Sequence, residues 1–152
     1  MTGPLMTKRR QLLLAVGAAA ALVLFGASAC KKEARCRNCG MRIDPTSAWR
    51  AELVSADGTL TAFDTPRCAL LSWRSGKTPA KSLRVVEYYE RTARDGNDVR
   101  FLIGGDVVGP MGPDLVPVDP SRAPKFLQDH GADRALRLGE VTPEVLAAVG
   151  KK

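Results

Sequence analysis

The chain is poor in several residue types that mark common functions. Of its 152 residues, 5% are aromatic and one is a histidine, and the 23 basic and 16 acidic residues give a net charge of +7. The basic residues are scattered along the sequence. Nucleic-acid binding usually needs a clustered basic stripe interleaved with stacking aromatic side chains. The composition therefore argues against a nucleic-acid partner.

Long apolar runs are scarce as well, and the longest lies near the N-terminus. Three basic residues precede an uncharged run over residues 12–29, which is barely long enough to cross a bilayer. Small residues then lead up to Cys30 in "ASAC". This pattern is typical of a bacterial lipoprotein signal, so we expect a signal peptide over 1–29 and a lipid on Cys30. An uncleaved anchor is the alternative, and both place 31–152 outside the cytoplasm, on the periplasmic side of the cell envelope.

The cysteine count leaves an odd number in this oxidising compartment. With Cys30 lipidated, Cys36, Cys39 and Cys68 remain, and three cysteines cannot all pair within one chain. A Cys36–Cys39 disulfide stays open and would leave Cys68 free. A domain of about 120 residues can bury enough apolar surface to fold without a disulfide. The cysteines are therefore credible candidates for chemistry.

After a tether and CxxCGM segment over 30–42, the chain is predicted to form two similar halves. In the first, over 43–92, "AWRAELVS" and "TLTAF" are typical strands joined by a turn at "ADG". Thr65-Pro66 predicts the start of a helix that ends near Gly76, and "SLRVVEYYE" predicts a third strand.

The second half, over 99–150, repeats this order. The segments "DVRFLIGG" and "DLVPV" predict two strands, a helix follows that stops at Gly131, and "ALRLGEV" predicts a closing strand. A short last helix is expected in "TPEVLAAVG", and "RTARDGND" is expected to be a polar, flexible connection between the halves. The predicted fold class is α+β, with two ββαβ units.

The segment "CRNCGM" brings soft sulfur atoms together. Cys36, Cys39 and Met41 fall within six residues, and Cys68 lies in the first turn of the predicted helix. Met111 sits in "GPMGP", a stiff loop through which no helix or strand continues to carry it into a core. Thiolate and thioether ligands together select Cu(I) over harder ions. The sequence therefore predicts a Cu(I) site.

His130 and the three cysteines leave other interpretations open. His130 precedes Gly131 and is either an imidazole ligand or a residue that favours a helix C-terminus. Cys36, Cys39 and Cys68 with His130 would also make a structural zinc site of the treble-clef type, in an order of knuckle, hairpin and helix. A thiol–disulfide enzyme is a weaker alternative, because the CxxC does not begin a predicted helix.

Four segments, "CRNCGMRI", "FDTPRCALL", "IGGDVVGPMGPDLVPV" and "FLQDHG", occur in an order and spacing that resemble the NosL family. These are lipoprotein accessory proteins of nitrous oxide reductase, and the resemblance runs from about Cys36 to about Glu140. It implies a membrane-tethered periplasmic Cu(I) carrier, not an enzyme, that supplies nitrous oxide reductase or its assembly apparatus. It also implies two ββαβ units similar to those of the organomercurial lyase MerB.

The resemblance assigns metal-ligand candidates by position. Cys39 and Met41 match the family's "CGM", Met111 matches "GPMG", His130 matches "HG", and Cys68 matches a cysteine at a helix start in many members. Two residues depart from the family's pattern: Pro113, which follows "GPMG", and Ala132, which follows "HG". The MerB likeness raises organomercurial cleavage as an enzymatic alternative, in which the methionine loop has no part. A homodimer that completes the site also stays open.

Overall fold

The computed structural model describes residues 33–151. The expected signal peptide over 1–29 and the expected lipid on Cys30 lie outside the described residues. Within the described part, none of the helices has both the length and the apolar character needed to cross a bilayer.

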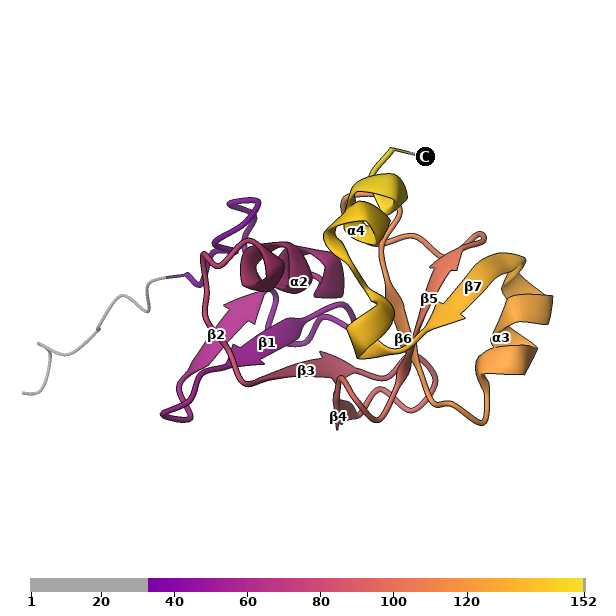
Figure 1. Ribbon diagram of the computed structural model, residues 1–152, viewed down its shortest axis with the longest axis horizontal. Coiled ribbons are helices and arrows are strands. Elements are labelled where there is room, and N and C mark those ends of the chain that lie inside the picture. The colour runs from indigo at the N-terminus through magenta and orange to yellow at the C-terminus, as the bar shows by residue number, and fades with distance from the viewer. Residues whose placement is uncertain (1–32, 152) are drawn as a thin grey trace, which may run out of the picture. The chain divides into compact units, whose positions relative to one another are not determined.

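The first half forms a four-stranded antiparallel sheet with one helix (Figure 1). Its strand order is β2-β1-β3-β4, so the first strand lies in the interior of the sheet. Helix α2 connects β2 to β3. The elements are β1 (Ala51–Val54), β2 (Leu60–Phe63), α2 (Pro66–Arg74), β3 (Ser82–Val86) and β4 (Ala93–Asp95).

The second half repeats this arrangement with three strands in the order β6-β5-β7. Helix α3 connects β6 to β7 as α2 connects β2 to β3, and the first strand of the half is again central. The elements are β5 (Arg100–Gly104), β6 (Val116–Val118), α3 (Ala123–His130), β7 (Ala132–Leu136), a 3-10 turn η1 (Leu138–Glu140) and α4 (Pro143–Val149). The predicted α+β fold of two ββαβ units is confirmed.

Two details of the prediction are wrong. The expected flexible connection contains strand β4, which pairs with β3 through Arg84–Asp95 and Val86–Ala93, so backbone hydrogen bonds order this polar segment. The closing strand of the second half begins directly after α3 and ends at Leu136. Residues 138–140 turn into η1 instead, where the Glu140 side chain accepts a hydrogen bond from the Arg137 backbone N–H at 2.6 Å.

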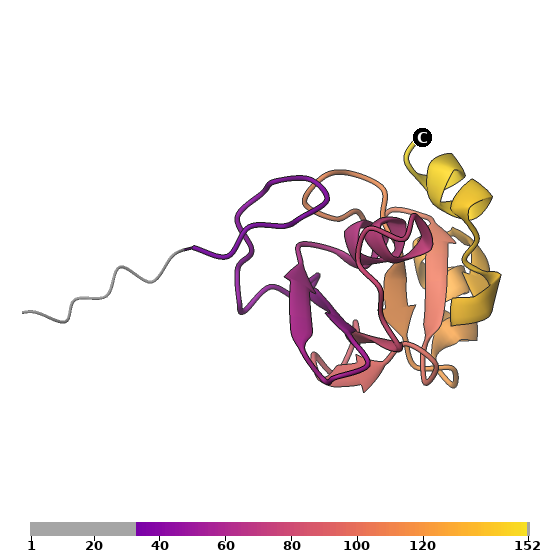
Figure 2. The same cartoon turned by 60° about the vertical axis from the view of Figure 1, so that its left-hand side comes forward.

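The larger of two hydrophobic clusters contains residues of both halves. Strand β5 alternates between two clusters: Phe101 and Ile103 pack with residues of the first sheet, α2 and α4, and Leu102 packs toward α3. Side chains of successive strand residues point to opposite faces. Strand β5 is therefore covered on both faces of the sheet, which explains why Phe101, Leu102 and Ile103 are all buried. Figure 2 shows α2 and α4 near the second sheet from another side.

Helix α2 begins where the sequence predicts. Thr65 is the N-cap, with an extended backbone, and its side chain accepts a hydrogen bond from the Cys68 backbone N–H at 3.2 Å. Pro66 follows in the first turn, where its missing N–H costs nothing. The cap therefore holds Cys68 in a fixed position at the start of the helix.

Candidate metal site

Three cysteines from two separate segments meet at one place. Cys36 and Cys39 lie on the loop before β1, and Cys68 lies in the first turn of α2. Their Sγ atoms all lie within 4.8 Å of one another, and the three are free thiols. Among the described residues, these three cysteines form the cluster of potential ligand side chains that is close enough to hold a metal ion.

Backbone hydrogen bonds close the loop that carries the first two cysteines. The Cys36 N–H donates to the Met41 carbonyl at 2.8 Å, and the Gly40 N–H donates to the Cys36 carbonyl at 2.8 Å. Gly40 has φ of 78°, a left-handed conformation that costs glycine little. Cys36 is buried in the main core at 2% exposure, and Cys39 is half-buried. The tight turn thus aims both sulfur atoms at α2.

Hydrogen bonds give the three thiols different acidities. The Cys68 thiol donates to the Cys36 sulfur, and backbone N–H groups of residues 64, 39 and 38 add further donors, which together lower the pKa of Cys36 to about 4 against the opposing effect of burial. The same hydrogen bond and burial raise the pKa of Cys68. Burial raises the pKa of Cys39. One thiolate and two thiols therefore share the site at neutral pH.

Two residues beside the sulfur atoms were not singled out from the sequence. The Asn38 Nδ2 atom donates to Cys68 Sγ at 3.5 Å, across a separation of 30 residues. Asp64 is buried at 5% exposure, and its Oδ2 atom has no hydrogen-bond partner in the described structure. Burial, and then the Cys36 charge, raise the pKa of the Asp64 carboxyl. Asn38 inside the CxxC and Asp64 directly before the cap were the signals available.

The spacing of the sulfur atoms suits a metal ion with few ligands. Metal–sulfur bonds of about 2.3 Å in a trigonal arrangement put the sulfur atoms roughly 4 Å apart. The three Sγ atoms, all within 4.8 Å of one another, are compatible with this spacing. Both segments already face each other, which keeps the cost of reorganisation low.

The two candidate methionines lie at the surface. Met41 follows Cys39 by two residues and is 39% exposed, and Met111 is 53% exposed. Met111 occupies the tip of a tight hairpin over residues 109–112, here called the Met111 hairpin. The Gly109 and Gly112 backbones exchange two hydrogen bonds, at 2.8 and 3.1 Å, and Gly112 has φ of 95°. Neither thioether is used as core filler.

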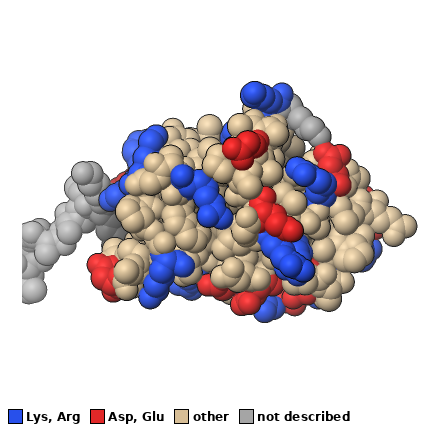
Figure 3. Space-filling view, in the orientation of Figure 1, with Lys and Arg blue, Asp and Glu red and all other residues tan. Residues whose placement is uncertain are grey.

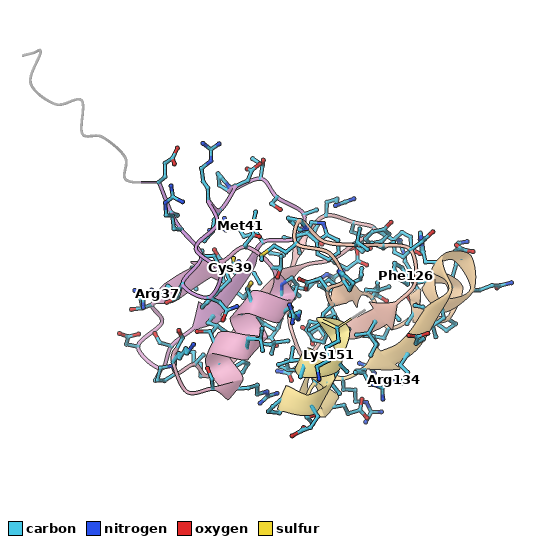
Figure 4. The ribbon with its side chains drawn as sticks, turned by 90° about the horizontal axis from the view of Figure 1, so that it is seen from above. Arg37, Cys39, Met41, Phe126, Arg134 and Lys151 are labelled. Carbon is cyan, nitrogen blue, oxygen red and sulfur yellow. The ribbon has the colours of Figure 1, made fainter. Side chains whose placement is uncertain are left out.

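His130 lies in a different part of the domain. Its Nδ1 atom is 2.9 Å from Asp106 Oδ1, and its ring packs against Phe126 with centroids 4.4 Å apart. Figure 4 shows Cys39 and Met41 close together beside α2, and Phe126 toward the opposite end of the domain. The structure therefore does not bring His130 into the cysteine cluster. Its place at the last residue of α3, before Gly131 with φ of 61°, fits the helix C-terminus interpretation.

The visible face of the domain carries charges of both signs. On the face in Figure 3, lysine and arginine side chains alternate with acidic ones. The described residues include ion pairs between exposed side chains, such as Arg42 with Glu33 at 3.0 Å. Exposed pairs of this kind contribute little to stability.

The chain is similar to one protein family and to one solved structure described below. No curated protein matches the chain. Among solved structures, the crystal structure of the copper chaperone NosL from Shewanella denitrificans is similar in fold, with a TM-score of 0.62 and 18% identity, over 72% of this chain and 90% of that chain. The NosL family model matches residues 27–146. The chain therefore belongs to the NosL family.

Proposed function

We propose that this protein is a Cu(I)-binding chaperone of the cell envelope. It is held at the membrane by a lipid on Cys30 and delivers copper for the assembly of nitrous oxide reductase. It performs no enzymatic reaction. The cysteine cluster carries the proposal: three sulfur atoms within 4.8 Å of one another, outside any disulfide, are suited to a soft ion. The solved relative named above as a copper chaperone supports the choice of cargo.

The three cysteines Cys36, Cys39 and Cys68 would bind the ion on the side of the core. The thioethers of Met41 and Met111 would bind it from the side of the solvent. A thioether needs no deprotonation, so it adds a ligand without releasing a proton. The lowered pKa of Cys36 means that this sulfur can bind the ion at neutral pH without first losing a proton. The half-buried Cys39 and the exposed methionines give an acceptor protein a way to exchange ligands.

The direct test is a titration of the reduced protein with Cu(I), without oxygen, against a competing Cu(I) chelator. We expect binding of about one ion per chain or per dimer, with an unchanged fold. Replacing Met111 with Ile should keep the fold and weaken Cu(I) affinity about tenfold, because a thioether ligand is lost. Val108 lies near the same hairpin and is 55% exposed, so Val108→Ala is the matched control. Equal affinity of Met111→Ile and wild type would remove Met111 from the site.

The alternatives make different predictions. A structural zinc module should unfold when a chelator removes the metal, whereas a carrier stays folded without its cargo. In the zinc alternative His130 was the candidate fourth ligand, and the structure places it beside Asp106 instead. An organomercurial-cleaving enzyme should turn over its substrate and lose activity in Cys36→Ser. Zinc-dependent folding with no competition for Cu(I) would contradict the chaperone proposal.

A further inference from the structure

We propose that Asp114 is the positioning residue that fixes the Met111 hairpin to the helix that carries Cys68. This inference rests on the proposed function, because it assigns Asp114 to the same metal site. It acts through the two backbone segments that hold Cys68 and Met111.

The Asp114 carboxylate bonds directly to the start of α2. Its side chain is buried, with 6% exposure. Its Oδ1 atom accepts hydrogen bonds from two backbone N–H groups, that of Arg67 at 3.0 Å and that of Leu115 at 2.8 Å. The Thr65 hydroxyl also donates to it. The first backbone N–H groups of a helix lack partners within the helix, so this carboxylate satisfies one of them across 47 residues of sequence.

The same hydrogen bonds continue to Cys68. The Thr65 oxygen donates its proton to Asp114 and accepts the N–H of Cys68 at 3.2 Å. Asp114 is therefore one hydrogen-bonded residue away from the backbone of a metal-ligand candidate. Loss of the carboxylate would release the Met111 hairpin from this turn, whereas the Thr65 side chain would still cap the Cys68 N–H.

The Met111 hairpin is packed against Asp114 from the other side. A Cβ atom added at Gly109 would lie 3.2 Å from the Asp114 Cβ and 3.5 Å from Trp49 Cε3, so the base of the hairpin lies directly on both side chains. Two backbone hydrogen bonds stiffen the hairpin itself. Met111 is thus an exposed side chain on a rigid support whose base is fixed to α2 by a buried carboxylate.

Pre-organisation of this kind matters most for a weak ligand. A thioether is held to a metal less firmly than a thiolate, so its contribution depends on being placed correctly before the ion arrives. If the hairpin were free to move, ordering it would consume part of the binding energy. Asp114 should therefore affect Cu(I) affinity through Met111 and leave the three-thiol part of the site intact.

The experiment is a double-mutant cycle on the full chain, reduced and without oxygen, with Cu(I) affinity measured against a competing chelator. Asp114→Ala should weaken affinity about tenfold, in the range found for groups that orient metal ligands. In a Met111→Ile background the same change should have no further effect. Cadmium binding, followed by thiolate-to-metal absorbance, should be unchanged, because the three cysteines remain in place.

Glu87→Ala is the matched control for general destabilisation. Glu87 is fully buried, and its carboxylate accepts the Asp119 N–H at 3.1 Å and the Glu90 N–H at 2.6 Å at another junction of the domain. This variant should lower stability without changing Cu(I) affinity. If Asp114→Ala does not fold, Asp114→Asn, which keeps the shape and one acceptor oxygen, takes its place in the cycle.

The outcomes separate the two proposals. If the wild-type protein does not compete for Cu(I), the chaperone function fails, and the role of Asp114 falls with it. If the wild type binds Cu(I) and the Asp114 variants bind equally well, only the Asp114 inference is overturned. An equal loss with and without Met111 also overturns it, because the carboxylate would then act on the whole fold.

Discussion

At the scale of single residues, hydrogen bonds stabilise the charge on Cys36 in place of solvent. The side chain is buried, and burial alone would raise the pKa of a thiol. The donors from Cys68 and from three backbone N–H groups outweigh this effect and bring the pKa to about 4. The Cys36 thiolate is therefore present above this pH and protonated below it.

This ionisation can be measured in the reduced, metal-free protein from the ultraviolet absorbance of thiolate. We expect the absorbance of one thiolate per chain at neutral pH, lost as the pH falls through about 4. Cys68→Ala removes the strongest donor, so the transition should move up toward the ordinary value of 9.0. Cys36→Ser should abolish it. A transition near 9.0 in the wild type would contradict the hydrogen-bond arrangement.

The sequence indicated much of the candidate site at this scale. Cys36, Cys39 and Cys68 were recognisable from the CxxC and from the first turn of a capped helix, and the structure brings their sulfur atoms together. Asp64, Asn38 and Asp114 were not singled out. The roles of Asn38 and Asp114 depend on contacts across 30 and 47 residues of sequence, which no local pattern encodes.

At the scale of elements, the first turn of α2 organises both the fold and the site. Thr65 is 1% exposed, caps the helix and donates to Asp114. Thr142 caps α4 in the same way, but its hydrogen bond to the Val145 N–H is longer, at 3.4 Å, and exposed. The two caps therefore form an internal comparison between a buried network and an isolated cap.

Thr65→Ala should lower the free energy of unfolding by about 1–2 kcal/mol, the upper part of the range for a lost N-cap, because a buried network loses its hydroxyl. Thr142→Ala should cost less. Thr65→Ser keeps the oxygen and should recover most of the loss. Urea denaturation followed by circular dichroism measures all three, and equal losses at both caps would contradict the role given to Asp114 and Thr65.

At the scale of the whole domain, the shared core predicts that the two ββαβ units unfold together. Phe101 and Ile103 of the second unit lie in the same cluster as Leu83 and Val85 of the first. A further link joins the Tyr88 N–H to the Pro117 carbonyl at 2.8 Å. Neither unit can separate without exposing apolar surface of the other.

The two tryptophans test this cooperativity. Trp73 packs against the larger cluster and Trp49 against the smaller one, which contains α3. Trp49→Phe and Trp73→Phe each leave one fluorescent reporter. Within each variant, the fluorescence and circular dichroism transitions in urea should coincide, as expected for two-state unfolding. Separate midpoints for the two probes would show that the units unfold independently.

The order of the elements was predictable from the sequence because turn and cap signals separate them clearly. Thr65-Pro66 and Gly131 each mark a helix boundary as predicted, and the short helix expected in "TPEVLAAVG" is present as α4. Strand β4 was not predictable, since the polar residues 93–95 become a strand only by pairing with β3. The alternation of Phe101 and Leu102 between two clusters also depends on how the halves pack.

The exposure of Met41 and Met111 has a chemical consequence. A thioether that an incoming ion can reach is equally open to peroxide, which converts methionine to its sulfoxide. The product presents a polar oxygen where a soft sulfur donor stood, and a soft ion favours it less. The working life of such a surface then depends on the repair of methionine sulfoxide, or on a bound ion that shields the sulfur atoms from oxidants.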